Sequence, residues 1–227
     1  MPYAVGKKML QFQSGLIYGD IDGINPSYTL EGFTFGIQGR YGLLESLEIR
    51  SSASWSSESI ISQGETYKLG GISFLNLGAR VNFIDGNGAS PSLGLDAEIR
   101  MQNIGPPEYQ IDQPAPRVLV LYNMPLLKHF LFTTNFGLTW DNFNDHPFGS
   151  YTLNLSTNLR EEWSVFVESY ANLFANTTGS NFNAGAAYLV SKDLQLDLFF
   201  NYYGIHGYPR GWGLNAGVSL RLDLQKG

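Results

Sequence analysis

The feature that most limits how this chain can fold is the strict alternation of apolar and polar residues. In the segment LQLDLFFNYY (194–203), Leu196 and Leu198 fall on one side of an extended chain. Asp197 falls on the other side, because successive side chains of a strand point to opposite faces. Such a strand fits either a soluble sandwich or the wall of a membrane barrel, depending on where water meets its polar face.

This alternation recurs about every 19 residues and predicts about twelve strands. The predicted strands are centred on residues 9–19, 29–41, 47–55, 69–83, 91–101, 116–124, 130–140, 149–159, 163–173, 182–190, 194–203 and 212–222. No segment carries the period of an amphipathic helix, so the predicted fold class is all-β.

The connections between the predicted strands alternate in length. Short connections are expected at residues 43–46, 85–88, 125–128, 160–162 and 191–193. Longer ones are expected near residues 20–28, 56–66, 102–114, 141–148, 174–181 and 204–210. Short turns at one end and long loops at the other are typical of outer-membrane barrels, and an even strand number places both termini at the short-turn end. The sequence therefore predicts a transmembrane up-and-down antiparallel β-barrel of about 12 strands, built as a single domain over residues 1–227.

Composition favours the membrane barrel over the soluble sandwich. Charged residues make up 15% of the chain, against about a quarter in soluble domains. A solvated outer face would carry lysines along the strands, but the lysines lie at or beyond the predicted strand ends, at Lys7, Lys8, Lys68, Lys128, Lys192 and Lys226. Aromatic residues form two bands, as in the girdles of outer-membrane barrels. The band beside the short turns contains Tyr41, Phe83, Tyr122, Phe130, Trp163 and Tyr188. The band beside the long loops contains Tyr18, Trp55, Tyr67, Trp140, Phe148, Tyr202 and Trp212.

The sequence argues against several classes of function. The net charge is -6 and basic clusters are absent, so nucleic acid is not an expected partner. The chain has no Cys, which removes thiolate catalysis, disulfides and Cys-based metal sites. No apolar run reaches the roughly 18 residues of a transmembrane helix. The first residues also lack the apolar segment of a signal peptide, which is compatible with a mature exported chain.

We expect neither an enzyme nor a cofactor or metal site. His129 falls at a short connection, while His146 and His206 fall in long ones, and the sequence contains no GxSxG motif. A barrel hydrolase would need a Ser, a His and an orienting polar residue together. The stretch DNFNDHP (141–147) could offer oxygen ligands to a divalent cation, but its spacing does not match an EF-hand and favours a solvated acidic loop.

Alternation also assigns a set of charged side chains to the lumen. These are Arg40, Glu48, Arg50, Arg80, Asp96, Glu98, Arg100, Glu168, Asp197 and Arg221. Most of them lie a few residues from a short turn or from the C-terminal end, so they are expected in the periplasmic half of the lumen. Arginine is the cation suited to enclosed pairs with carboxylates. The cluster fits a charged constriction that sets selectivity, and it fits equally a salt-bridged plug that holds the barrel in shape.

Several segments resemble one family of outer-membrane barrels, labelled putative MetA-pathway of phenol degradation. The similar segments are PYAVGKKMLQFQSG (2–15), YGLLESLEIR (41–50), LNLGARVNF (75–83), EEWSVFVESYA (161–171) and AAYLVSKDLQLDLFF (186–200). The resemblance covers nearly the whole chain. It implies a twelve-stranded barrel that is usually described as a transporter and has no established catalytic residues.

These observations lead to one expected function and one alternative. The expected function is an outer-membrane channel or transporter that passes a small polar or aromatic solute through a narrow charged lumen. The alternative is a non-conducting structural or accessory barrel of a larger outer-membrane complex. The expected location is the bacterial outer membrane, and the expected partners are outer-membrane lipid and lipopolysaccharide, a small-molecule solute and other proteins of a membrane complex.

Overall fold

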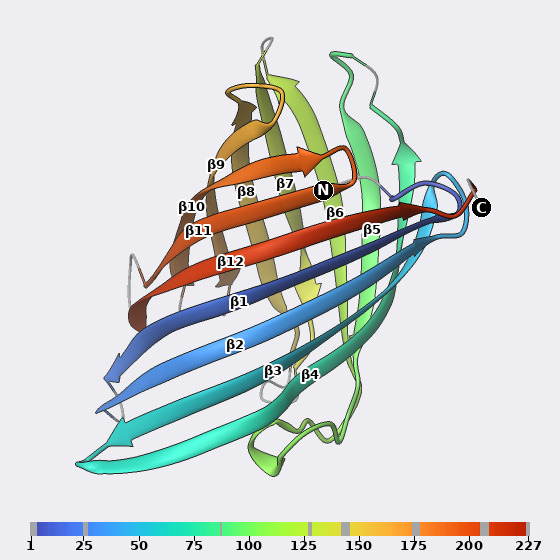
Figure 1. The fold of residues 1–227 in the computed structure, drawn as a ribbon. Coiled ribbons are helices and arrows are strands. Elements are labelled where there is room, and N and C mark those ends of the chain that lie inside the picture. The colour runs from blue at the N-terminus through green and yellow to red at the C-terminus, as the bar shows by residue number, and fades with distance from the viewer. Residues whose placement is uncertain are drawn as a thin grey trace.

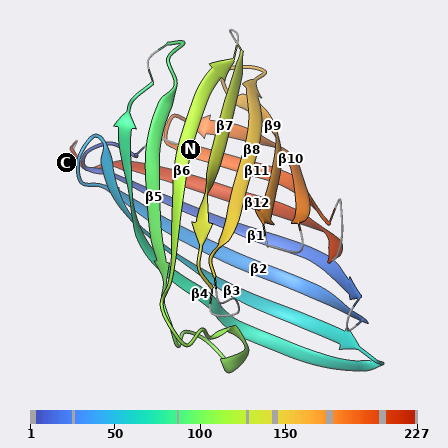
Figure 2. The same ribbon diagram turned by 180° about the vertical axis from the view of Figure 1, so that it is seen from behind.

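A computed structural model describes residues 4–24, 27–86, 88–126, 129–141, 146–173, 178–204 and 209–225. In these residues the chain forms twelve strands, joined in chain order into a closed antiparallel barrel in which β1 also pairs with β12 (Figures 1 and 2). The strands are β1 (Met9–Ile24), β2 (Ser27–Gly42), β3 (Leu47–Ser62), β4 (Glu65–Ile84), β5 (Ser92–Arg100), β6 (Ala115–Leu126), β7 (Phe130–Thr139), β8 (Phe148–Asn158), β9 (Trp163–Leu173), β10 (Thr178–Ser191), β11 (Leu194–Tyr203) and β12 (Arg210–Asp223). The predicted fold class and strand number are confirmed.

Two of the predicted long loops are wrong, because the strands beside them continue. In the first, β1 and β2 stay paired as far as Ile24 and Ser27. In the second, β3 and β4 stay paired to Ser62 and Glu65, leaving only a two-residue turn. Figure 1 shows these four strands reaching well beyond the rest of the barrel. Their outer parts are rich in Ser, Asp and Gly, so they lack the outward apolar face that identifies a membrane strand in sequence.

The long connection at residues 102–114 is confirmed and contains a short 3-10 helix, η1 (Pro107–Tyr109). Parts of the other predicted long loops, residues 142–145, 174–177 and 205–208 with His206, lie outside the described residues. Among the residues that are described, no helix is long and apolar enough to cross a membrane.

The burial of side chains inverts the pattern of a soluble protein. On β11, Leu196, Leu198 and Phe200 are 46%, 54% and 45% exposed, whereas Asn201 is 3% exposed. The largest fully buried side chains are polar, and they are Glu48, Asn123 and Asp96. On β11 the polar face therefore meets the lumen and the apolar face meets lipid, as the alternation predicts.

Aromatic pairs support the two predicted bands. Trp163 and Tyr188 pair beside the short turns, with ring centroids 4.8 Å apart. Tyr18 and Trp212 pair towards the long-loop end, with centroids 6.0 Å apart. Amphipathic rings at both ends of an apolar belt are the anchors that barrels use at the two membrane interfaces.

Strand β1 begins and strand β12 ends at the short-turn side, as predicted. The Leu224 amide donates to the Lys8 carbonyl at 3.1 Å, and the Lys8 amide donates to the Gly42 carbonyl at 2.8 Å. Gly42 is the last residue of β2 before the short turn 43–46. The periplasmic rim is thus closed by backbone hydrogen bonds between the first, second and last strands.

Candidate functional site

A buried ion pair joins β2 and β3 near their short turn. Arg40 donates to both carboxylate oxygens of Glu48, through Nε and Nη2, each at 2.8 Å. The side chains are 2% and 0% exposed. The turn 43–46 is tight enough to bring Glu48 directly opposite Gly42. Arg40, two residues before Gly42, therefore lies diagonally across from Glu48 on the same face of the sheet. Arg40 Nη1 also donates to Gln11 at 3.3 Å, and the Val5 amide donates to Glu48 at 2.9 Å.

A second group of ion pairs centres on Asp96. Arg80 lies directly opposite Asp96 in the β4–β5 register, and its Nε and Nη2 donate to Asp96 Oδ2 at 3.0 and 2.8 Å. Arg50 of β3 donates to the same oxygen. Asp96 is 1% exposed, and its Oδ1 has no hydrogen-bond partner among the described residues.

The Arg50 side chain of β3 reaches across β4 to β5, because the residue of β4 that lies between them is a glycine. Gly78 of β4 is paired with Arg50 on one side and with Glu98 on the other. A Cβ atom on Gly78 would lie 2.6 Å from Glu98 Cγ, so only glycine fits there. Arg50 Nε consequently lies 2.9 Å from Glu98 Oε1, an ion pair that lacks the angle of a hydrogen bond.

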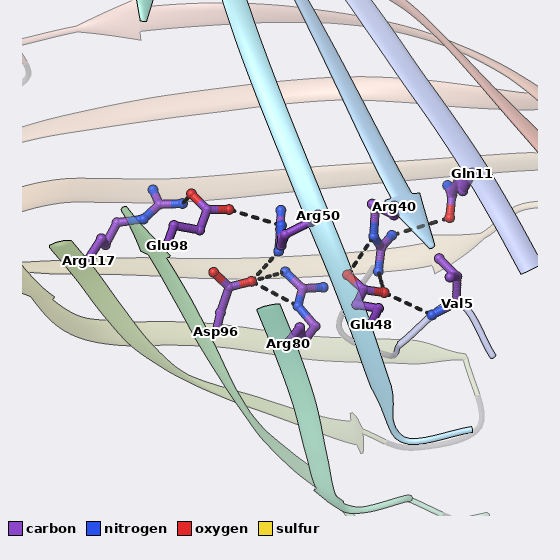
Figure 3. A network of polar contacts seen from close by, with 9 residues as sticks. All are labelled: Val5, Gln11, Arg40, Glu48, Arg50, Arg80, Asp96, Glu98 and Arg117. Carbon is purple, nitrogen blue, oxygen red and sulfur yellow. Dashed lines mark hydrogen bonds and ion pairs between the residues drawn. The ribbon is translucent and has the colours of Figure 1, made fainter. Parts of the chain in front are cut away.

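Arg117 of β6 completes the network and was missed in the sequence. Its Nη2 donates to Glu98 at 2.6 Å, and its side chain is 40% exposed. The inward face of β6 also carries Leu119 and Leu121, so no polar alternation marks Arg117 as a lumen residue. We use the term Arg/carboxylate network for the charged side chains drawn in Figure 3, namely Arg40, Glu48, Arg50, Arg80, Asp96, Glu98 and Arg117. With four guanidinium groups and three carboxylates, this network is nearly neutral.

Two further predicted lumen residues are Arg100 and Arg221. Arg100 ends β5 at its long-loop side, where it donates to the carbonyls of Ser73 and Tyr109 at 3.0 and 2.8 Å. It therefore anchors the loop 101–114. Arg221 lies on β12 opposite Gln11.

The loop 101–114 is also held by a tyrosine. Tyr109 of η1 donates to Glu58 of β3 at 2.9 Å. Burial raises the pKa of the Tyr109 hydroxyl, and the hydrogen bond to the Glu58 carboxylate raises this pKa further. The phenol therefore stays protonated, and it remains a donor, well into the alkaline range.

The opposite wall of the lumen carries the remaining two predicted residues, and their surroundings differ. Glu168 of β9 accepts from Asn154 and Asn183, each through Nδ2 at 3.1 Å. These three side chains face the lumen in one row across β8, β9 and β10. Asp197 of β11 makes no hydrogen bond or ion pair with any described residue. Asn154 and Asn183 were not singled out in the sequence, although alternation places both on the inward face.

Three adjoining cavities run past the Arg/carboxylate network. One of about 630 Å³ is lined mainly by β1, β2, β3 and β12, with the small residues Gly15, Gly36 and Ser54 among its walls. A second of about 580 Å³ lies against β7–β11 and shares Gln13, Asp197 and Phe199 with the first. A third of about 290 Å³ lies near the loop 101–114 and shares Glu98 and Arg117 with the first.

The histidines do not form a reactive group in the described part of the chain. His129 and His146 are both exposed, at opposite ends of the fold. Within the described ranges, no three His, Cys, Asp or Glu side chains lie close enough together to hold a metal ion.

Comparison with solved structures identifies the same architecture. The COG4313 outer membrane channel from Pseudomonas putida F1 matches with a TM-score of 0.77 and 13% identity over 97% of each chain. The NanC porin matches with a TM-score of 0.62 and 8% identity, over 92% of this chain and 100% of the porin. The translocator domain of the autotransporter NalP from Neisseria meningitidis matches with a TM-score of 0.59 and 13% identity, over 96% of this chain and 89% of that domain. At these identities the likeness shows the fold alone, which is that of outer-membrane barrels.

The sequence itself matches one family. No curated protein matches the chain. The profile of the family described as "Putative MetA-pathway of phenol degradation" matches residues 2–222. The closed barrel, its apolar belt and this family match all indicate that the protein lies in the bacterial outer membrane. The chain therefore belongs to this family and is a β-barrel of the bacterial outer membrane.

Proposed function

We propose that this barrel is a passive channel for a small polar or aromatic solute. The observation that carries the proposal is the series of adjoining cavities, which extends along the lumen past the Arg/carboxylate network. Their walls combine Ser, Thr and Asn side chains with Phe74, Phe166 and Phe199. Such walls offer both hydrogen bonds and apolar contact to a passing molecule.

Charge selectivity follows from the network in this proposal. Most of its groups are paired and buried, so their fields largely cancel. Arg117 is the member most open to the lumen, and its side chain is paired only with Glu98 among the described residues. A charge on this side chain therefore acts directly on ions that pass it.

Single-channel conductance in a planar bilayer, at two salt concentrations, tests the proposal. Discrete conductance steps are expected from the folded barrel. Arg117→Gln should shift the reversal potential towards cations, because one unit charge at about 8 Å in water is worth about 0.5 kcal/mol, or about twofold in relative permeability. Arg160→Gln is the matched control, since Arg160 lies exposed at a short turn outside the lumen. Equal shifts in both variants would contradict a selective role for Arg117.

One observation favours a second candidate function, a non-conducting barrel within a larger complex. Arg40 and Glu48 are almost wholly buried, and Val5 from the chain start is bonded to Glu48 at the periplasmic end. A network of this kind seals a lumen as well as it lines one. A folded barrel that gives no conductance steps would support this candidate and direct the search to protein partners.

A further inference from the structure

The outer parts of β1 to β4 reverse the polarity of the barrel wall below them. We call residues 19–24, 27–32, 57–62 and 65–70 of these strands the overhang, which Figure 1 shows reaching beyond the rest of the barrel. Its outward face carries a polar row of directly paired residues, namely Asp20, Glu31, Ser59 and Lys68. One residue further towards each strand tip, its inward face carries a directly paired row that is apolar, namely Ile21, Leu30, Ile60 and Tyr67. We call these four residues the apolar row.

The apolar row lies on the face of the sheet that lines the lumen. Side chains alternate along a strand, so Ile21 shares a face with Ile17, and Leu30 shares a face with Thr34. Ile17 and Thr34 both line the cavity of about 630 Å³. Directly paired residues share a face, so the whole apolar row is turned towards the mouth of the lumen and away from lipid.

Water reaches the apolar row. Tyr67 is 56% exposed, and the other three side chains are partly exposed. Four strands about 4.8 Å apart make the row about 14 Å wide. Apolar surface that is gathered in one place and faces water marks a binding site more often than a structural need. The row is wide enough to hold a molecule of one or two aromatic rings.

A path that carries no side chains joins the apolar row to the lumen. Along β1 and β2, three directly paired couples follow one another on the inward face, namely Ile21 with Leu30, Gly19 with Gly32, and Ile17 with Thr34. The first couple belongs to the apolar row, and the last couple lines the cavity of about 630 Å³. Between them lie only the two glycines. A molecule on the apolar row is therefore next to the lumen.

The loop 101–114 lies under the other half of the apolar row. Tyr109 of this loop donates to Glu58 of β3. Pro106 packs against β4 so closely that a Cβ atom on Gly71 would lie 2.7 Å from Pro106 Cδ. The loop thus fills space below the β3–β4 half of the row, while the glycine path runs below the β1–β2 half.

The charges beside the apolar row are negative. Glu58 and Glu65 lie in the two adjacent inward rows, and the inward face of the overhang carries no Lys or Arg. Carboxylates beside the row repel an anion. The row itself offers no partner to a charged group, and a charge that loses its water there is costly. These properties select a neutral apolar molecule.

We propose that the apolar row captures an uncharged aromatic solute from outside the cell and releases it along the glycine path into the lumen. The inference names a solute class for the proposed channel, and to that extent it rests on the proposed function. The binding to the apolar row can be measured whether or not the barrel conducts.

Calorimetric titration of the folded barrel in lipid nanodiscs provides the direct test, with the heat of empty nanodiscs subtracted. The probe is 2-naphthol, and 2-naphthoate is the control with the same rings and a negative charge. We expect 2-naphthol to bind, and 2-naphthoate to bind at least about tenfold more weakly because of the neighbouring carboxylates. Equal binding of the two molecules would overturn the proposal.

Variants locate the binding on one face of the overhang. Leu30→Ser and Ile60→Ser should each weaken 2-naphthol binding about fivefold, and the double variant at least about twentyfold, because each removes apolar surface from beneath the rings. Ile61→Ser is the matched control, since Ile61 is the next residue of β3, faces outward and is 43% exposed. Loss of binding in Ile61→Ser, or full binding in the double variant, would overturn the site.

Conductance separates the two proposals. If ion current flows but the double variant binds 2-naphthol as the parent does, the channel stands and the capture site is wrong. If the barrel is silent but its binding of 2-naphthol needs Leu30 and Ile60, the site stands and the channel is wrong. Heat-modifiable migration on a gel establishes that each variant is a folded barrel before either measurement.

Sedimentation of the barrel in detergent tests a different occupant of the same face. We expect the parent barrel and Ile60→Ser to sediment alike. A dimer that Ile60→Ser disperses would assign the apolar row to a second copy of the chain and overturn the proposal.

Discussion

Removal of the Glu48 carboxylate tests how dry the periplasmic end of the lumen is. In Glu48→Ala the Arg40 guanidinium loses two hydrogen bonds of 2.8 Å, and the Val5 amide loses its acceptor. Arg40 is 2% exposed, and its contact to Gln11, at 3.3 Å, is longer than the two that it loses. The substitution thus removes a carboxylate from beside a nearly buried cation.

The expected loss of stability follows from this burial. Breaking a buried ion pair by removing one partner costs about 3–5 kcal/mol, because the other charge stays desolvated. An exposed pair contributes only about 0.2–1 kcal/mol. The double variant Arg40→Met/Glu48→Leu removes both charges and should lose less than Glu48→Ala alone. The coupling energy between the two positions should therefore be at least about 2 kcal/mol.

Equilibrium unfolding in guanidinium chloride, followed by tryptophan fluorescence of the barrel in lipid, measures these free energies. The four members of the cycle are the parent barrel, Glu48→Leu, Arg40→Met and Arg40→Met/Glu48→Leu, and Glu48→Ala is measured beside them. A single-variant loss below about 1 kcal/mol, with additive effects in the double variant, would refute the reasoning. It would mean that water reaches this ion pair in the folded barrel.

Three further predictions concern the wall, the network and the loop. Leu196→Arg should reduce the unfolding free energy by about 2–4 kcal/mol, because Leu196 faces the bilayer core. An unchanged free energy in the same unfolding assay would mean that Leu196 faces the lumen instead. Gly78→Val should displace Glu98 from Arg50 and alter ion selectivity in a bilayer, whereas retained selectivity would show that Arg50 does not need this gap. Because the pKa of the Tyr109 hydroxyl is raised, docking of the loop 101–114 should survive as pH rises past about 10, the ordinary pKa of tyrosine. Docking should be lost only when the pH passes the raised pKa of Tyr109 in the folded barrel. Limited proteolysis of the loop would show this, and Tyr109→Phe should be cleaved faster than the parent at neutral pH.

The strands inside the membrane could be predicted because their signal is local. Segments 163–173 and 194–203 coincide with the observed β9 and β11. In each, lipid on one side and a wet lumen on the other force the two-residue period into the sequence itself. In the outer parts of β1 and β2, the polar residues Asp20, Asp22 and Glu31 interrupt the outward apolar face, so the same reasoning placed the strand ends too close to the membrane.

The lumen charges were predicted residue by residue, but their partners were not. Alternation places Arg50 and Glu98 on the inward face, yet they lie on strands separated by β4. Their contact depends on Gly78 standing between them in the register of the closed sheet. Arg117 joins them from a strand whose inward face is otherwise apolar.

The sequence by itself thus determined the fold class, the strand number and the face that each strand turns to lipid. Those properties depend only on the solvent beside each residue, which a linear pattern records. The tertiary structure alone decided that Arg40, Arg50 and Arg80 pair with carboxylates. It also decided that Asp197 has no ion pair with any described residue. Which inward side chains meet is set by the stagger of strands around a closed barrel, and that stagger is a property of the whole sheet and not of any one segment.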